Sequence, residues 1–275
     1  MSETIVLYFG DIFGKPGRRA VAAALPNLIA EHSPDFIIGN VENLAGGRGV
    51  NKKTYNEMVA LGFHGFTSGN HIWDNKDVLA IMESDSRLLR PANYPSALDF
   101  PCPGKGVGLL HSRDKSLLLI NLMGRVFMDS IDCPFMAVDK ILRENKADAP
   151  ILVDMHADAT SEKAAMGWFL DGKVTAVVGS HSHVQTADER LLPGGTAYIT
   201  DVGLTGSFDS CIGLVKDEII RKFLTKRPQH YQVATGNLGV CCVIIRIGRN
   251  NKATSIERLR FPVKFEGFSI DKDQE

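Results

Sequence analysis

Short apolar runs alternate with helical stretches along most of the chain, and this alternation restricts the fold to the α/β class. Several runs are apolar on both faces, as the strands of a helix-covered sheet must be. Strands are predicted at residues 5–9, 36–39, 65–67, 117–122, 151–155, 176–179, 197–200 and 240–247. Helices are predicted at 18–32, 53–61, 76–83, 138–146 and 161–170. A further strand at 255–261 follows the turn 248–251, which predicts a closing antiparallel hairpin.

The length and the absence of internal repeats predict one domain over residues 1–275. One segment departs from the alternation. Residues 201–232 are rich in glycine, threonine and charge before a helical pattern at 215–224, and we expect a cap or lid within the domain there.

The composition limits the cellular location and the kinds of partner that we expect. The formal net charge is −1 with both signs spread along the chain, which argues against a dedicated duplex-DNA or membrane-surface binder. No apolar stretch reaches the ~20 residues of a membrane helix, and the N-terminus does not resemble a signal peptide. Five cysteines without a CxxC spacing argue against a disulfide framework or a thiolate zinc site, so we expect a reducing, cytoplasmic location.

Polar clusters follow five predicted strands, each at the carboxyl end. Ligands of α/β sheets gather at that edge, so these side chains are expected to lie together. The clusters are Asp11, Glu42–Asn43, Asn70–His71, His156 and the pair His181 and His183.

Each cluster alone has a plainer interpretation. Asp11 could be a turn or capping residue, Glu42–Asn43 a solvated loop, and His156 a hydrogen-bonded structural histidine. The His-Ser-His triplet is more informative, because alternate residues of an extended segment point the same way. A chance placement of all five clusters on one sheet edge is much less probable than a metal site.

The donor types select the chemistry. Imidazoles with hard oxygen ligands and no thiolate suit Mn, Fe or Zn better than a closed structural zinc site, with Mg as a further candidate. A carboxylate can bridge two cations. Two metals roughly 3.5–4 Å apart can activate water for in-line attack on phosphorus.

The motifs resemble those of the calcineurin-like metallophosphoesterase superfamily, and most closely those of YmdB-type bacterial phosphodiesterases, which act on 2′,3′-cyclic nucleotides. The resemblance spans nearly the whole chain. It is carried by GDIFGKPGR (10–18), NVENLAGGRG (40–49), SGNHIWD (68–74), NLMGRVFM (121–128), DMHADATSEK (154–163), GSHSHVQTAD (179–188) and DVGLTGSFDS (201–210). It implies a layered α/β sandwich with mixed central sheets, a homo-oligomer, and two metal ions, Fe and/or Mn before Zn or Mg.

The resemblance also implies roles for individual residues. Asp11 and His183 would bind the first metal, Glu42 would bridge, and Asn70, His156 and His181 would complete the second site. Asn43 would contact the substrate phosphate, and His71 would lie above the metals as an acid or phosphate ligand. Many superfamily members carry Asp-x-His on the first strand, whereas this chain has Asp11-Ile12-Phe13. The first metal therefore has fewer protein ligands.

The resulting hypothesis is hydrolysis of a small phosphodiester or 2′,3′-cyclic nucleotide by a metal-bridging hydroxide, with His71 as general acid. RNA would be only an indirect partner, and no membrane is involved. Two alternatives stay open, since a site does not fix its substrate. One is a phosphomonoesterase, protein phosphatase or RNA nuclease on the same metals. The other is a regulatory protein that binds metal and nucleotide with little turnover. The loop 46–49 lacks the phosphate-loop pattern of nucleotide triphosphatases, and the sequence leaves open whether it, Lys15 or Arg18 touches substrate.

Overall fold

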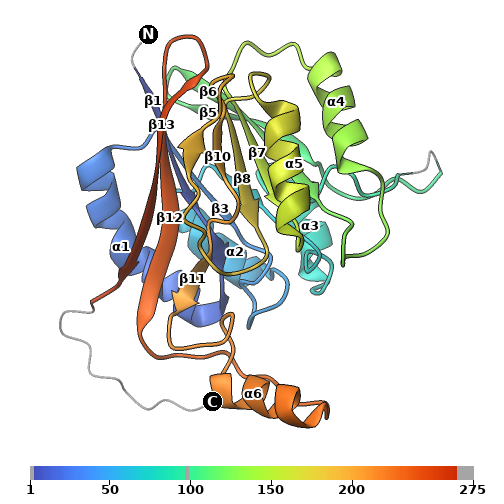
Figure 1. Ribbon diagram of the computed structural model, residues 1–275, viewed down its shortest axis with the longest axis vertical. Coiled ribbons are helices and arrows are strands. Elements are labelled where there is room, and N and C mark those ends of the chain that lie inside the picture. Colours follow the sequence, from blue (N-terminus) through green and yellow to red (C-terminus); the bar gives the residue numbers. More distant parts are fainter. Residues whose placement is uncertain (1–2, 97–98, 265–275) are drawn as a thin grey trace.

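The computed structural model describes residues 3–96 and 99–264, and two β-sheets packed face to face form its centre (Figure 1). The first sheet has the order β2-β11-β12-β1-β3-β4, with β13 paired to β12, and the second has the order β5-β6-β7-β8-β10-β9. The first sheet comprises β1 (Thr4–Phe9), β2 (Asp11–Ile12), β3 (Phe36–Asn40), β4 (Gly65–Thr67), β11 (Leu204–Ser207), β12 (Leu238–Ile247) and β13 (Ala253–Pro262). The second comprises β5 (Val107–Ser112), β6 (Lys115–Met123), β7 (Ile151–His156), β8 (Ala176–Ser180), β9 (Arg190–Leu191) and β10 (Ala197–Ile199).

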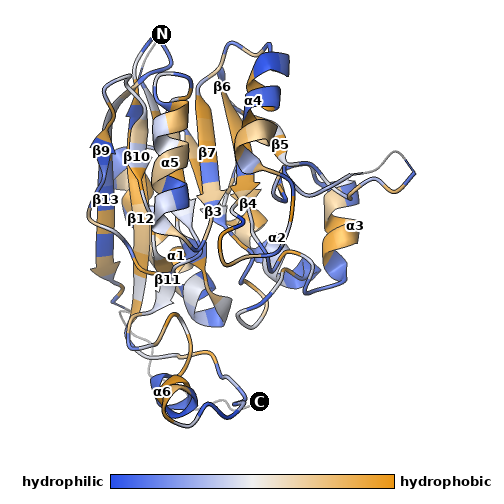
Figure 2. Ribbon diagram, turned by 45° about the vertical axis from the view of Figure 1, so that its right-hand side comes forward, coloured by the Kyte–Doolittle hydropathy of each residue, from blue (hydrophilic) through white to orange (hydrophobic). Residues whose placement is uncertain are grey.

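Helices cover the outer face of each sheet. Figure 2 shows the strands as predominantly apolar, with polar residues on the outer surfaces of the helices. The helices are α1 (Gly14–His32), α2 (Lys52–Ala60), α3 (Asp77–Ser84), α4 (Pro134–Glu144), α5 (Thr160–Leu170) and α6 (Lys216–Thr225).

The period-two alternation of the strands divides the core into three layers. On β1, Val6 and Tyr8 face the second sheet, whereas Leu7 and Phe9 face α1 and α2. On β6, alternate residues likewise pack between the sheets or beneath α4 and α5. Each fully buried large apolar side chain contributes about 1.5–3 kcal/mol. The result is the layered α/β sandwich that the sequence predicts.

Parallel pairing brings the functional strand ends together. Strands β1, β3 and β4 are parallel neighbours in the first sheet, and β6, β7 and β8 are parallel neighbours in the second. Their carboxyl ends therefore lie at the same end of the sandwich.

Several elements differ from the sequence prediction. Helix α1 begins at Gly14 instead of residue 18 and continues through Pro26. Proline in the first turn is compatible with a helix, so the GKPG segment that resembles a loop is helical. The edge strand β5 and the short strands β2, β9 and β11 were not predicted.

The segment 201–232, predicted as a cap or lid, has two structural parts. Residues Leu204–Ser207 form β11, which pairs with β2 and β12 inside the first sheet. The following excursion carries α6, which projects from the body of the molecule (Figure 1).

Within the described residues, no helix is both long enough and apolar enough to cross a membrane. All five cysteines are unpaired.

Candidate metal centre

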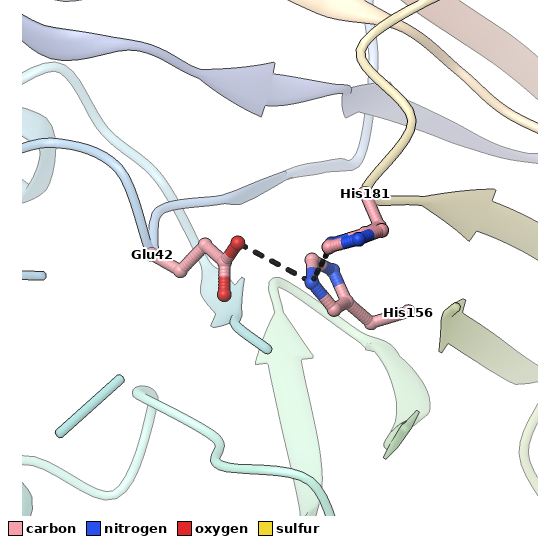
Figure 3. A group of neighbouring side chains, drawn as sticks. All are labelled: Glu42, His156 and His181. Atoms are coloured by element: carbon pink, nitrogen blue, oxygen red, sulfur yellow. Dashed lines mark hydrogen bonds and ion pairs between the residues drawn. The ribbon is translucent and has the colours of Figure 1, made fainter. Parts of the chain in front are cut away.

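The structure brings all eight predicted site residues to the carboxyl ends of the parallel strands. Glu42, His156 and His181 come from three different strand ends, and their donor atoms all lie within 4.8 Å of one another (Figure 3). The Nε2 atom of His156 lies 3.3 Å from Oε1 of Glu42 and 3.0 Å from Nδ1 of His181. Asn70 joins this group, with its Oδ1 atom 3.1 Å from the same Nε2. Donor atoms of Glu42, His181 and Asn70 therefore surround Nε2 of His156.

A second group lies beside the first. The Oδ1 atom of Asp11 is 3.7 Å from Nε2 of His183. The amide nitrogen of Asn43 lies 3.3 Å from Oε1 of Glu42 and 3.3 Å from the same imidazole nitrogen. The two groups are also linked through the backbone, because the amide of His181 donates to Oδ2 of Asp11.

Glu42 is connected to both groups: its Oε1 atom faces His156 of the first group directly, and Asn43 links it to His183 of the second. It is 1% exposed, and its Oε2 atom accepts a hydrogen bond from the backbone amide of His71. Burial opposes its ionisation, but the charge and hydrogen bonds of His156 and His71 outweigh burial and lower the pKa of Glu42 to about 2. Glu42 is therefore a carboxylate at any physiological pH.

At Asp11 the effect of burial on the pKa prevails. Burial raises the pKa of Asp11 to about 6, and the positive charges of His183 and His156 only partly oppose this. Burial by itself would lower the pKa of His156, but the negative charges of Glu42, Asp11 and Asp154 raise it to about 9. Burial and the charge of His156 lower the pKa of His181 to about 3. The buried carboxylates thus favour a positive charge at His156, and a bound metal ion would supply that charge in place of the proton on Nε2. Burial favours the neutral form of His181, which presents a lone pair.

A buried network beneath His156 sets its orientation. The hydroxyl of Ser180 donates to Oδ1 of Asp154 at 2.7 Å, so it accepts from Nδ1 of His156, which lies 2.9 Å away. Tyr8 donates to the other oxygen of Asp154 at 2.6 Å. With Nδ1 used in this way, Nε2 is the atom that faces the cluster. Such partners orient metal-binding imidazoles and increase their basicity.

The His-Ser-His triplet was predicted to be extended, and this prediction is wrong. Strand β8 ends at Ser180, and both His181 (φ 95°) and His183 (φ 61°) adopt positive φ values that side chains rarely accept. Both imidazoles still face the cluster. A buried ion pair holds this strained loop: Asp201 accepts from Lys163 at 2.6 Å and from the amide of Ser182 at 3.0 Å.

Gly69 permits the close approach of two strand ends. A Cβ atom at this position would collide with the imidazole ring of His156. The GNH sequence therefore places Asn70 on the cluster partly because the residue before it has no side chain.

His71 lies at the rim of the site, with its side chain 24% exposed. Its Nδ1 atom is 2.8 Å from Oδ2 of Asp74, and Asp74 also pairs with Arg48 of the glycine loop at 3.2 Å. The carboxylate holds the proton on Nδ1 and leaves Nε2 as the unpartnered ring nitrogen. Asp74, Asp154, Ser180 and the pair Lys163–Asp201 were all missed as functional residues, although each lies within or beside a family motif.

Arg18 has structural partners. Its guanidinium bonds Glu57 of α2 at 2.6 Å and the carbonyl oxygen of Leu44. This favours a role in fixing the loop that follows Glu42 over direct contact with substrate. Lys15 is exposed at the start of α1.

One observation that is independent of the motifs supports metal binding by these donors. Oδ1 of Asp11 is a buried carboxylate oxygen without a hydrogen-bond partner among the described residues, and it faces the imidazole of His183. Leaving such an atom unsatisfied is costly unless a cation binds it. Carboxylate, amide oxygen and imidazole donors without thiolate are the ligands of Mn, Fe or Zn in catalytic sites.

The fold and the donor cluster define a protein of the calcineurin-like metallophosphoesterase class. The family model described as YmdB-like protein matches residues 7–259, so the chain belongs to the YmdB-like family. It is 43% identical over 256 residues to the 2′,3′-cyclic-nucleotide 2′-phosphodiesterase of Bacillus subtilis, covering 92% of this chain and 96% of the relative.

Solved structures agree. A hypothetical protein from Thermus thermophilus superposes with a TM-score of 0.88 at 40% identity, covering 95% of this chain and 100% of that one. A structure described as a novel phosphatase from Mycoplasma pneumoniae gives a TM-score of 0.90 at 31% identity, with coverages of 95% and 94%. A structure described as a putative 5′-nucleotidase from Staphylococcus aureus, at 16% identity and a TM-score of 0.62, shares the fold and covers 98% of this chain and 56% of that one.

Proposed function

We propose that the protein is a metal-dependent phosphoric ester hydrolase that opens 2′,3′-cyclic nucleotides. The observation that carries the proposal is the position of Glu42, a buried carboxylate that contacts one donor group directly and is linked to the other through Asn43. The activity in the name of the Bacillus subtilis relative supports the substrate class.

The residues fit two ions. Asp11 and His183 would hold the first, Asn70, His156 and His181 the second, and Glu42 would be shared. Such ions supply Lewis-acid stabilisation of charge on the phosphate oxygens and an attacking water of lowered pKa. We propose Fe or Mn as the occupants. A cytoplasmic location and a homo-oligomeric state remain predictions from the sequence.

The chain itself supplies binding and proton transfer. The amide of Asn43, between Glu42 and His183, offers a neutral donor to the substrate phosphate. His71 would donate the proton on Nε2 to the ribose oxygen that leaves phosphorus, while Asp74 fixes the ring through Nδ1. In the net reaction one water adds to the cyclic ester, the P–O2′ bond breaks, and O2′ becomes a hydroxyl.

A substrate panel tests the proposal. The metal-loaded protein is assayed with 2′,3′-cyclic nucleotides, 3′,5′-cyclic nucleotides, and simple mono- and diesters, and products are identified by phosphorus NMR. We expect the 2′,3′-cyclic esters to have the highest kcat/KM and to yield 3′-monophosphates. Preference for monoesters would replace the proposal with a phosphatase, and binding without turnover would leave a regulatory protein.

A further inference from the structure

The C-terminal part of helix α6 and the residues after it carry an unusual local charge, whereas the first turn of the helix holds Asp217 and Glu218. Residues 221–231 contain four lysine or arginine residues and no aspartate or glutamate, in a chain whose formal net charge is −1. We call this segment the basic arm. It projects from the end of the sandwich toward which β8 points (Figure 1). Its basic side chains are exposed. They are Arg221, Lys222, Lys226 and Arg227.

These four cations are not neutralised by ion pairs with any carboxylate in residues 3–96 or 99–264. Two of them lie over aromatic rings instead. Lys222 is 5.2 Å from the ring centroid of Tyr231, and Lys226 is 5.5 Å from that of Phe223. Phe223 is 67% exposed. Exposed rings among unpaired cations are the composition of surfaces that bind single-stranded nucleic acid.

The loop that leads into α6 and the basic arm contacts the candidate metal centre. The carbonyl oxygen of Ile212 lies 2.9 Å from Nδ1 of His183. The excursion then closes through the Leu214–Val233 bridge and the hydrogen bond from the Val215 amide to the Gln232 carbonyl. A ligand held by the arm could therefore extend to the metals without crossing the body of the protein.

The chemistry of the proposed substrate identifies the ligand. A 2′,3′-cyclic phosphate forms when a ribose 2′-hydroxyl attacks the adjacent phosphodiester, so the reaction that creates it leaves it on the 3′ end of an RNA fragment. Upstream phosphates and bases of such a fragment would continue outward from the site.

We propose that the basic arm binds the upstream nucleotides of single-stranded RNA, and that the preferred substrate is an RNA 3′ end bearing a 2′,3′-cyclic phosphate. This inference rests on the proposed function and names its substrate class. Cations would contact phosphates, and Phe223 and Tyr231 would stack on bases. The bond changes are those of the mononucleotide reaction: one water is consumed, P–O2′ breaks, and the RNA leaves with a 3′-phosphate.

An anionic membrane surface would also attract a short basic helix with exposed apolar residues. RNA is favoured because the arm adjoins the phosphoesterase centre and because its cations are interleaved with aromatic rings. Vesicle binding is therefore an outcome of the test.

The first measurement compares two substrates with the metal-loaded enzyme: a ten-nucleotide RNA ending in a 2′,3′-cyclic phosphate, and a 2′,3′-cyclic mononucleotide. We expect kcat/KM to be at least about tenfold higher for the RNA. The variant Arg221→Gln/Lys222→Gln/Lys226→Gln/Arg227→Gln should lose that preference and retain mononucleotide turnover within about twofold. The salt dependence of RNA turnover should become shallower, because each phosphate contact contributes a slope of about −0.7 in log–log form.

A matched control removes the same charge elsewhere. Lys140→Gln/Arg143→Gln/Lys146→Gln/Arg249→Gln changes four exposed cations on and near α4 and in the β12–β13 turn. It should leave both substrates unaffected. Phe223→Ala and Tyr231→Ala should each lower RNA kcat/KM by roughly fivefold or more.

Binding gives a readout that does not depend on turnover. The protein is titrated into a labelled ten-nucleotide RNA with a 3′-hydroxyl, and into vesicles of phosphatidylglycerol and phosphatidylcholine. Arm-dependent RNA binding is expected. Equal kcat/KM for both substrates with no arm-dependent RNA binding overturns the inference, and arm-dependent vesicle binding in that case assigns the arm to membranes. Hydrolysis of neither substrate overturns the proposed function, while arm-dependent binding of the RNA would still support the arm.

Discussion

The two halves of the candidate metal centre are built differently. The half around His156 has three protein donors in addition to Glu42, and its central imidazole is fully buried above Ser180 and Asp154. The half around Asp11 has two donors in addition to Glu42, and one oxygen of Asp11 lacks a partner among the described residues. We infer that the first half is organised before metal binds, whereas the second would leave coordination positions for water or substrate. Rigid ligation and substrate access would then be divided between the two halves.

The largest effect is expected where the halves meet. Glu42→Gln removes the shared negative charge, so both ions should be lost and turnover should fall to background. Bound metal is measured by elemental analysis together with kcat/KM, and exposed Glu144→Gln serves as the control. A Glu42→Gln protein with two metals and full activity would refute the shared position.

His71 tests whether proton transfer is separate from metal binding. His71→Ala should lower kcat by about 10²–10⁴, the usual contribution of a general acid, while metal content stays unchanged. Turnover of a diester with an activated leaving group, which needs no proton, should be affected much less. An equal loss on both substrates would assign His71 to metal or phosphate binding.

The asymmetry between halves is tested by matched ligand deletions. His156→Ala should weaken binding of one ion by more than about 100-fold, above the range for outer partners, and excess metal should not restore activity. His183→Ala should also weaken metal binding, yet regain substantial activity at high metal concentration because fewer ligands define that position. The measurement is activity against free metal concentration, with folding checked by circular dichroism. Identical titrations for the two variants would contradict the division.

A smaller effect is expected beneath the rigid half. Ser180→Ala removes the hydroxyl that orients His156 and should weaken metal affinity by about 10–100-fold without abolishing binding. Ser182→Ala, in the loop that follows β8, is the matched control and should change affinity little. Unchanged affinity in Ser180→Ala would show that packing alone positions the imidazole.

The sequence predicted the site residues better than the residues that orient them. Asp11 and Glu42 could be placed together because parallel strands of one sheet end at the same edge. His156 ends a strand of the second sheet, and the packing of the two sheets brings it to the same site. Asp154 and Ser180 lie inside strands β7 and β8, and only the pairing of those strands shows that their side chains meet. Inter-strand register is not encoded by residue spacing, so this network stayed invisible.

The prediction of the strands was limited in the same way. Strongly apolar strands such as β6 and β7 were predicted, because burial on both faces leaves a continuous apolar pattern. Strands β5 and β11 were missed. The sequence of β11, LTGS, contains glycine and threonine, and it becomes a strand through its neighbours β2 and β12 instead of its own propensity.

Gly69 has a consequence for how this protein can vary. It has no side chain that could bind metal or substrate, yet the ring of His156 occupies the space that any side chain would need. The residue at this position is therefore restricted by the available space and not by the chemistry of a side chain. In a library covering every substitution, position 69 should tolerate replacement as poorly as the residues that bear functional groups, and a search for catalytic groups by chemistry alone would overlook it.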